Sequence, residues 1–495
     1  MVVKYLIIFF LSLGAVFPSF AAEKPVDSNA AIVIFGATGD LTSKKLFPAL
    51  YSLASQDKID KSSVIVGVGR RDISSDQFRK QMQAAVEEAQ GVDKNFWNQF
   101  QKRIYYHQAD FDQDEGYGRL KKLLDDLGAS NRLYYLSSQP SHFPVIVEKL
   151  KTNGLVYDPG NGEKWSRVAI EKPFGHDLNS ALALQEQISA HLGENQIYRI
   201  DHYLGKEGMQ NLLDFRFKEG AFEPLWNRRF IDHIQITLSE EIGIETRAQF
   251  WEETGLVRDL FQNHLMQILT LAAMESPGSL SPDAIHAEKL KLLESIRPFS
   301  LDQMEQLTVV GQYGTGAVKG SQVPSYRQEK GIPSESSVET FAAAKLFIDN
   351  ERWKGVPFYL RAGKRLPVKT TEIAIVFKGV ESEKGHTLFI RIQPEPAVFL
   401  QKIPKKSDEA RSLIRLDAPS KSSTEAYEKI FVASLQGDKS LFVQADEQIS
   451  SWRLWTPVID YWKSHPSNSF PNYSAGTWGP KAAEGLVSWE VLGKP

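Results

Sequence analysis

The side chains best suited to chemistry gather in one short segment near the middle of the chain. Asp201, His202, Tyr203 and Lys206 offer a carboxylate, an imidazole, a phenol and an ammonium group. The last three together supply the donors that a phosphate group needs, which makes the segment a candidate anion site. The alternative is a structural role, in which Asp201 caps a turn, Tyr203 packs in the core and Lys206 is solvated.

A glycine-containing turn near the start of the chain is a second candidate. The apolar run 31–35 leads into G-A-T-G-D-L at 36–41, and a helical stretch follows from 43 to about 54. In this context glycines let the backbone approach a pyrophosphate, and the helix start presents free N–H groups. The spacing is G-x-x-G and not G-x-G-x-x-G, so an ordinary turn between strand and helix remains the alternative.

Two cationic residues follow later predicted strands. Arg70 comes directly after the run 64–69, where an arginine suits the 2′-phosphate of NADP and an acidic residue would suit NAD. The distance from the glycine turn exceeds the usual ~20 residues, so a solvated turn is the alternative. Lys172 follows the predicted strand 167–170, at the sheet edge where a nicotinamide would meet its substrate.

The elements that position these residues fall into two groups. From 29 to 200 apolar strands alternate with helices, which predicts an α/β, Rossmann-like dinucleotide-binding domain. After Glu207 the alternation stops, and β-rich runs stand apart from helices expected near 255–274, 282–295, 336–349 and 446–463. We therefore expect 201–495 to form an α+β domain with a large, mostly antiparallel sheet.

Composition excludes several classes of protein. A chain of 495 residues is long enough for two domains. Its net charge of −3 argues against a nucleic-acid binder. With no cysteine there can be no disulfide, thiolate nucleophile or zinc–thiolate site, and we predict no metal site at all.

The first 22 residues resemble an export signal. Lys4 precedes an apolar run of about 13 residues, and Ala21 and Ala22 suit signal peptidase. The run is shorter than the roughly 20 residues of a membrane span, so we expect cleavage and no stable span. The alternative is an N-terminal extension from a misplaced start codon. Export to a periplasm or medium conflicts with the supply of a nucleotide, which favours the cytoplasm, and both localisations stay open.

The segment 199–207 reads R-I-D-H-Y-L-G-K-E, and here the chain resembles the glucose-6-phosphate dehydrogenase family. The resemblance runs from about Ala30 to Glu490. Gln139 is a departure, because family members usually carry two consecutive prolines there, and we expect it to loosen the loop beside the nicotinamide. Further matching motifs lie at 36–50, 171–175, 226–228, 258–267, 350–358 and 360–366.

The resemblance implies oxidation of D-glucose 6-phosphate at C1 to 6-phosphoglucono-δ-lactone, the first step of the oxidative pentose phosphate pathway. NADP⁺ would accept the hydride, with NAD⁺ as a weaker alternative. His264 would be the general base, oriented by Asp201. A cis peptide before Pro173 and a homodimer or dimer of dimers built on the large sheet are also implied.

The remaining site residues are implied by the same resemblance. Those expected to hold the substrate are Lys172, His202, Tyr203, Lys206, Glu240, Asp259, Lys364 and Lys369, with Gln393 as a weaker candidate. Those expected to hold the cofactor are Gly36, Thr38, Gly39, Asp40, Leu41, Arg70 and Lys172.

Asp259 and His264 present a geometric difficulty. They are five residues apart, which is about 140° around an ideal α-helix at ~100° per residue. Both therefore cannot face one substrate from a straight helix, and we expect Asp259 to lie at or before the first turn.

Two other functions would fit parts of the pattern. A sugar oxidoreductase of the glucose–fructose type shares a Rossmann domain and a Glu-Lys-Pro motif, but lacks the 201–207 signature. A non-catalytic NADP-binding sensor would show an eroded set of charged residues. This chain keeps Asp201, His264, Lys172 and Lys206, which favours the enzyme.

Overall fold

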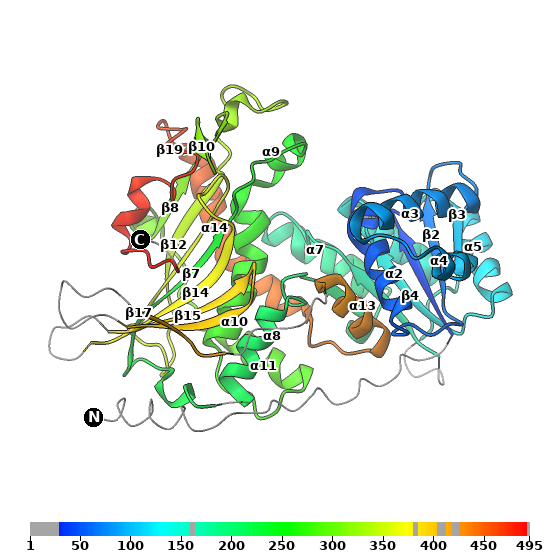
Figure 1. The fold of residues 1–495 in the computed structure, drawn as a ribbon, viewed down its shortest axis with the longest axis horizontal. Helices are drawn as coiled ribbons and strands as arrows, with labels where there is room; N and C mark the ends of the chain where they lie inside the picture. Colours follow the sequence, from blue (N-terminus) through cyan, green and yellow to red (C-terminus); the bar gives the residue numbers. More distant parts are fainter. Residues whose placement is uncertain are drawn as a thin grey trace.

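The computed structural model describes residues 29–158, 164–218, 220–379, 385–402, 412–417 and 425–492. The export-like segment 1–22 lies outside these ranges. Two large sheets dominate the described part, with helices around the first and between the two (Figure 1). Among the described helices, none combines the length and apolar character that a bilayer span requires.

The N-terminal sheet has seven strands in the order β18-β6-β5-β4-β1-β2-β3. All neighbours are parallel except β18 and β6. Strand order reverses between β1 and β4, which is where a doubly wound sheet opens a crevice for a ligand. The strands are β1 (Ala30–Phe35), β2 (Val64–Gly69), β3 (Ile104–Gln108), β4 (Asn131–Leu136), β5 (Ser166–Ile170), β6 (Ile197–Ile200) and β18 (Phe442–Val443).

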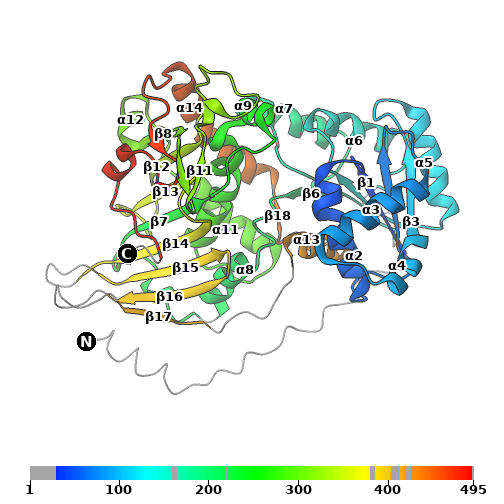
Figure 2. The ribbon, with the colours of Figure 1, turned by 45° about the horizontal axis from the view of Figure 1, so that its top comes forward.

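Helices cover both faces of this sheet (Figure 2). Alternate residues of β1 enter two separate cores: Ile32 packs with Phe47 and Phe78, and Val33 packs with Leu120 and Ile146. Burial on both faces explains why the strands read as continuous apolar runs. The helices are η1 (Thr42–Leu46), α2 (Phe47–Ser55), α3 (Ser75–Gln90), α4 (Lys94–Phe100), η2 (Gln101–Arg103), α5 (Asp114–Asp126), η3 (Pro140–His142), α6 (Phe143–Thr152), α7 (Leu178–Ser189) and η4 (Glu194–Gln196).

The second sheet has eight strands in the order β17-β16-β15-β14-β7-β13-β12-β8. Only the β7–β13 pair is parallel, so the prediction of a large, mostly antiparallel sheet is confirmed. The strands are β7 (Ile231–Ser239), β8 (Thr308–Gly311), β12 (Phe341–Phe347), β13 (Pro357–Gly363), β14 (Thr370–Phe377), β15 (Thr387–Gln393), β16 (Ala397–Lys402) and β17 (Ser412–Arg415).

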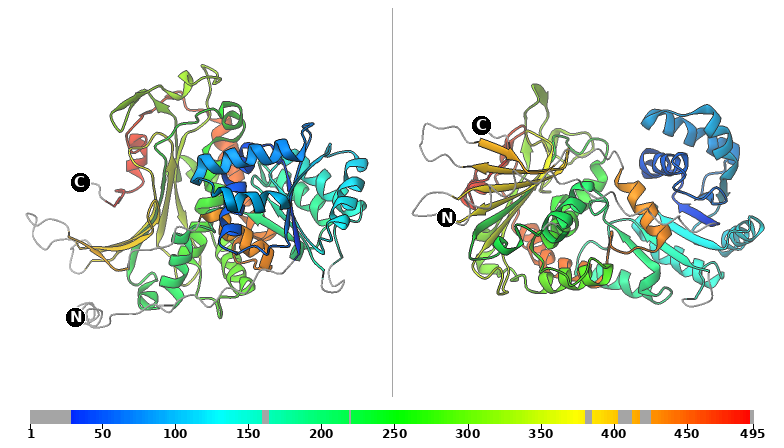
Figure 3. Two further views of the ribbon diagram at one scale, coloured as in Figure 1. Left: turned by 45° about the vertical axis from the view of Figure 1, so that its right-hand side comes forward. Right: turned by 60° about the horizontal axis from the view of Figure 1, so that its bottom comes forward.

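Most helices of the C-terminal half lie on the side of the large sheet that faces the N-terminal domain (Figure 3). The described helices of this half, on either side of the sheet, are α8 (Glu207–Leu213), η5 (Asp214–Lys218), η6 (Glu223–Leu225), α9 (Ala248–Leu256), η7 (Val257–Leu265), α10 (Met266–Ala273), α11 (Pro282–Glu294), η8 (Leu301–Gln303), α12 (Met304–Leu307), η9 (Tyr326–Gln328), α13 (Ala426–Gln436), α14 (Ala445–Ser464) and η10 (Lys481–Gly485). Two small sheets pair β10 (Gly316–Val318) with β11 (Ser321–Val323) and β9 (Tyr313–Gly314) with β19 (Tyr473–Ser474).

The late part of the chain returns to the N-terminal sheet. β18 pairs with β6, with Phe442 opposite Ile200, and α13 packs against α2. Residues from the range predicted for the second domain therefore complete the first one.

One predicted helix is wrong. The stretch 336–349 contains the strand β12, which pairs with β13 and β8. Ala342, Ala343 and Ala344 favour a helix by intrinsic propensity, but the segment is buried between two strands of the sheet. Tertiary packing overrides the local preference.

Candidate active site

The candidate site lies where β5 and β6 end against the helix that follows α9. Lys172 stands two residues after β5, and Asp201 directly follows β6. His264 reaches them from η7. Residues 172, 201 and 264, which are far apart in the sequence, therefore meet at one sheet edge. The Lys172–Pro173 peptide is cis, as predicted.

His264 and Asp201 form a buried pair. His264 Nδ1 lies 2.5 Å from Asp201 Oδ1, which also accepts a hydrogen bond of 3.0 Å from the Tyr203 N–H. Burial by itself would raise the pKa of Asp201, but His264 outweighs it and holds that pKa well below the usual range. The ionised carboxylate fixes the proton of His264 on Nδ1 and leaves Nε2 as a hydrogen-bond acceptor.

Lys172 joins this pair to Asp259. Its Nζ donates to Asp259 Oδ1 and to the Asp259 carbonyl, both at 2.9 Å, and lies 3.1 Å from His264 Nε2. Burial and the Lys172 ammonium lower the pKa of His264, although Asp201 opposes them. The pKa of Asp259 falls to about 2, because Lys172 outweighs the effect of burial. An imidazole that is neutral at pH 7 thus stands beside an ammonium group.

Asp259 lies in the first turn of η7, as predicted, and both it and His264 contact Lys172 Nζ. They can do so because Val257–Leu265 is a π-helix and not an α-helix, which the sequence did not indicate. Its hydrogen bonds join residues five apart, which places residues 259 and 264 on one face. π-Helical turns are rare and occur frequently at functional sites.

The phosphate-binding candidates are adjacent to His264. The Tyr203 ring stacks on the His264 ring with centroids 4.2 Å apart, and its hydroxyl accepts a 3.1 Å hydrogen bond from Gln393. Lys206 Nζ donates to Gln393 Oε1 at 2.7 Å. Burial, with the nearby charge of Lys369, lowers the pKa of Lys206 to about 8. Tyr203, Lys206, Lys369 and Gln393 therefore lie together.

His202 is a buried imidazole that packs against two other rings. Its ring lies edge-on to His264 at 4.7 Å and stacks on Tyr427 at 6.1 Å. Burial and His264 lower the pKa of His202 well below its usual value. The imidazole is therefore neutral at pH 7 in this structure, so Lys206 is the principal charged donor of the segment.

Glu240 and Lys364 form an adjoining pair. Lys364 Nζ donates to Glu240 Oε2 at 2.6 Å and lies 4.6 Å from the centre of the Trp251 ring. The charge of Lys364 also lowers the pKa of Asp259, although less than the charge of Lys172 does. Lys364 and Asp259 are therefore near neighbours. The structure thus brings Glu240, Lys364 and Asp259 close to Lys172 and His264.

The glycine turn is tightly built. Gly36 has a φ of +86°, and a Cβ there would lie 2.7 Å from the Ser137 carbonyl oxygen, so no other residue fits without movement. The N–H groups of Gly36 and Ala37 both donate to the Val68 carbonyl. Thr38 is half-buried, and Gly39 and Asp40 are exposed at the tip.

The other cofactor candidates surround this turn. Leu41 is half-buried and precedes η1. Arg70 is exposed directly after β2, which pairs in parallel with β1, so it lies at the same sheet edge as the turn. Gln139 is exposed in the loop after β4. The turn, Arg70 and this loop therefore follow the carboxyl ends of three neighbouring strands.

The sequence prediction missed a second buried pair of functional interest. Glu171 accepts a 2.5 Å hydrogen bond from the Tyr135 hydroxyl, and burial raises its pKa to about 7. Tyr427 also bonds to Glu171, and it stacks on His202. The Glu-Lys-Pro motif pointed to Glu171, whereas no sequence pattern pointed to Tyr427, which reaches the site from α13.

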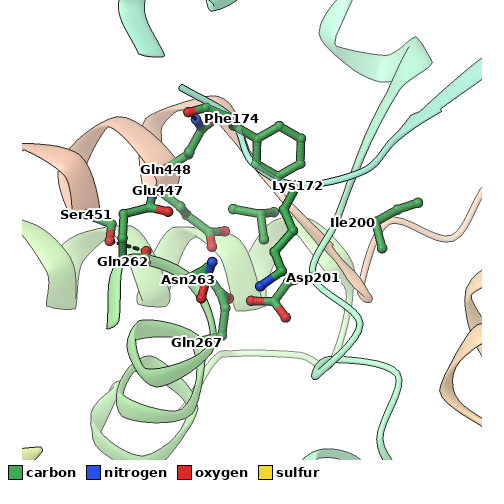
Figure 4. A pocket seen from close by; sticks show the side chains of 11 residues that line it. Lys172, Phe174, Ile200, Asp201, Gln262, Asn263, Gln267, Glu447, Gln448 and Ser451 are labelled. Atoms are coloured by element: carbon green, nitrogen blue, oxygen red, sulfur yellow. Dashed lines mark hydrogen bonds between the residues drawn. The ribbon is translucent and has the colours of Figure 1, made fainter. Parts of the chain in front are cut away.

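A small cavity is lined by Lys172 and Asp201 on one side and by side chains of η7 and α14 on the other (Figure 4). Among the described residues, Asp201 Oδ2 and Gln267 Oε1 find no hydrogen-bond partner, although both are buried. At its far side Glu447 pairs with Lys289 at 2.6 Å. The lining residues are Lys172, Phe174, Ile200, Asp201, Gln262, Asn263, Gln267, Val443, Glu447, Gln448 and Ser451.

One group of residues in the described ranges has the geometry to hold a metal ion: Asp201, His202 and His264. The Lys172 ammonium lies 3.1 Å from His264 Nε2 and would compete with a cation there. The arrangement suits proton transfer to a neutral imidazole better than metal binding.

Comparisons with known proteins agree with this geometry. Residues 33–211 match the model of the glucose-6-phosphate dehydrogenase NAD-binding domain, and 213–491 match that of the C-terminal domain. A glucose-6-phosphate 1-dehydrogenase of Chlamydia pneumoniae is 45% identical, with 93% of this chain and 96% of that protein covered. The protein of that name from Bacillus subtilis strain 168 is 40% identical over the same shares.

A solved structure described as glucose-6-phosphate dehydrogenase in complex with its substrate glucose-6-phosphate is 35% identical. It superposes with a TM-score of 0.84 and covers 94% of this chain and 100% of its own. With both domain models matched in sequence and the buried residues gathered at one sheet edge, the chain belongs to the glucose-6-phosphate dehydrogenase family.

Proposed function

We propose that this chain oxidises C1 of D-glucose 6-phosphate to 6-phosphoglucono-δ-lactone and passes the hydride to NADP⁺, with NAD⁺ as a weaker acceptor. The observation that carries the proposal is the convergence of Asp201, His264, Lys172 and Asp259 on one point. The names of the relatives and of the substrate complex support the same reaction.

In the proposed mechanism His264 Nε2 takes the proton of the C1 hydroxyl. The C1 hydrogen leaves with two electrons as hydride to the nicotinamide, and the C1–O bond becomes the lactone carbonyl. Asp201 keeps the imidazole in the required tautomer and stabilises the imidazolium that forms. Its pKa stays low, so it remains ionised throughout.

Lys172 would change partners during this step. Its Nζ now bonds Asp259 and lies beside His264. A bound sugar hydroxyl would replace one of these contacts, and the ammonium would then lie between substrate and nicotinamide. Burial, together with this charge, lowers the pKa of His264 and keeps the imidazole neutral before the reaction.

We assign the phosphate to His202, Tyr203, Lys206 and Lys369. Lys369 lies close enough to Lys206 that, after burial, its charge lowers the pKa of Lys206, and an anion between the two side chains would relieve this repulsion. The same anion would favour a charged His202. Gln393 then orients Lys206 and Tyr203 through its hydrogen bonds.

We assign the sugar hydroxyls to Asp259, Glu240 and Lys364, which supply acceptors and a donor next to the base. The pyrophosphate of the cofactor would lie on the turn formed by Gly36, Thr38, Gly39, Asp40 and Leu41. Arg70 would bind the 2′-phosphate at the same edge. Strong donors to phosphate and free backbone N–H groups are what such a ligand requires.

In the proposed division, 29–200 form the nucleotide domain and 201–495 the substrate and assembly domain. The matched ranges 33–211 and 213–491 support it. We further propose a homodimer or dimer of dimers through the large sheet. Leu413 and Ile414 on the edge strand β17 are exposed apolar residues that such an assembly would cover. Sedimentation of the purified protein tests this.

The location of the protein is a separate proposal. If residues 1–22 act as an export signal, the native protein begins near Ala22. Mass spectrometry of the protein from its own cells gives the answer, since a retained Met1 would contradict export.

The reaction is tested by following reduced nicotinamide absorbance with glucose 6-phosphate and each nucleotide. Free glucose is the control for the phosphate requirement, and fructose 6-phosphate is the control for the identity of the sugar. We expect turnover with glucose 6-phosphate and faster turnover with NADP⁺ than with NAD⁺. No reduction with either nucleotide would reject the proposal.

A further inference from the structure

The helix that carries Asp259 and His264 begins at an abrupt break. The backbone angles of Gly255, φ +67° and ψ 175°, lie outside the helical range. Helical geometry resumes at Leu256 and Val257. The first N–H groups after such a break have no acceptor within the helix. A π-helix leaves one more of them free than an α-helix, because each bond spans five residues.

Glu339 supplies the missing acceptor from a distant part of the chain. Its Oε1 accepts a 3.1 Å hydrogen bond from the Val257 N–H. A Cβ on Gly255 would lie 2.6 Å from the same oxygen, so the carboxylate rests directly on the bare Cα of the glycine. The carboxyl group lies at the positive end of the helix; burial raises its pKa, and the backbone N–H groups that it accepts from oppose this by favouring the ionised form.

The position of Glu339 is fixed on both sides. Gln312 Nε2 donates to the Val338 carbonyl at 2.9 Å, and the Thr340 N–H donates to the Gly311 carbonyl at 2.8 Å. Gly311 ends β8 of the large sheet. The backbone on both sides of Glu339 is therefore bonded to the end of the large sheet, which holds the Cα of Glu339 in place.

We propose that Glu339 is a positioning residue for the reaction. As a carboxylate cap on Val257, packed against Gly255, it fixes where the π-helix starts and so keeps Asp259 and His264 on the face that meets Lys172. Glu339 does not touch that group itself and acts through the helix. This inference rests on the proposed reaction, because it concerns the rate of that reaction.

The test compares Glu339→Ala, which removes acceptor and charge, with Glu339→Gln, which keeps an acceptor. Glu335→Ala, an exposed glutamate of the same loop, is the matched control. We expect Glu339→Ala to lower kcat about fivefold, as for the loss of a helix cap, with NADP⁺ affinity unchanged. Glu339→Gln should recover part of this loss, and Glu335→Ala should equal the wild type.

A double-mutant cycle with Gly255→Ala tests the contact itself. The added methyl group meets the Glu339 carboxylate in the wild type but not in Glu339→Ala. Gly255→Ala should therefore lower kcat less in the Glu339→Ala variant than in the wild type, even though the backbone strain at position 255 remains in both. If Glu339→Ala fails to fold, Glu339→Asp replaces it in the cycle, because its carboxylate is one methylene shorter and withdraws from Gly255.

The outcomes separate the two proposals. If the wild-type protein is inactive, the proposed reaction is contradicted. An active wild type with full kcat in folded Glu339→Ala would overturn the positioning role. Equal losses of kcat and of NADP⁺ affinity would also overturn it, because they would show a general structural effect.

Discussion

Two regions of the molecule are built in different ways: the proposed nucleotide edge, which is the turn 36–41 with Arg70, and the proposed acid–base point, which is Asp201 and His264 with Lys172. At the nucleotide edge the main features are a backbone turn, exposed side chains and one glycine that fits against Ser137. At the acid–base point, Asp201 and His264 are buried, and the contacts join residues from β5, β6 and η7. Local sequence therefore controls the first region, whereas packing between distant segments controls the second.

The largest expected effect tests the buried region. His264→Asn removes the proposed base while keeping a side chain that can hydrogen-bond. We expect kcat to fall at least ~10²-fold with little change in substrate binding, since general-base catalysis contributes about that much. Single-turnover and steady-state kinetics measure it. His107→Asn, which changes a buried histidine bonded to the Gly116 carbonyl, is the control for general damage. Near-normal turnover in His264→Asn would reject the assignment.

The amount that the sequence could predict follows the same division. The strand β1, the glycine turn and the helix after it follow from local patterns, and Gly36 is predicted from this context together with the resemblance, since the G-x-x-G spacing alone is ambiguous. The π-helix was not predicted, because nothing in 257–265 distinguishes it from an α-helix. Its start depends on Glu339, which is 82 positions further along the chain.

Two further differences have the same cause. The alanines of β12 favour a helix until neighbouring strands bury them on both sides. Tyr427 reaches Glu171 and His202 because α13 returns to the N-terminal sheet, a contact without any sequence signal. The resemblance named the individual site residues, but only packing showed that Lys172 joins Asp259 to His264.

The second prediction concerns the exposed region. Arg70→Ala should weaken NADP⁺ binding by ~1.5–3 kcal/mol and leave NAD⁺ binding unchanged, because a charged hydrogen bond to the 2′-phosphate is lost. Titration calorimetry with both nucleotides measures the difference. The neighbouring exposed Arg71→Ala is the control. Equal losses for the two nucleotides would show that Arg70 does not bind the 2′-phosphate.

The third prediction uses the pKa of Lys206, which burial lowers to about 8. The ammonium is charged below this pH and loses its proton above it, so attraction for the phosphate weakens as pH rises. The kcat/KM profile reports the free enzyme and should fall several-fold through pH 8. Lys206→Arg should move this fall to higher pH, since arginine stays charged. A profile that Lys206→Gln and Lys206→Arg leave unaltered would contradict the assignment.

The smallest effect is expected in the loop after β4. Gln139 has φ −63°, which is the value that proline imposes, and ψ 144°. Gln139→Pro should raise the free energy of unfolding by ~0.4–1 kcal/mol, because it restricts the unfolded chain without straining the folded one. Denaturant titration measures the change, and kcat should stay the same, since no charged group is altered. A loss of stability would show that the Gln139 N–H is used in the folded protein, and local sequence would then not be enough to describe even the exposed edge.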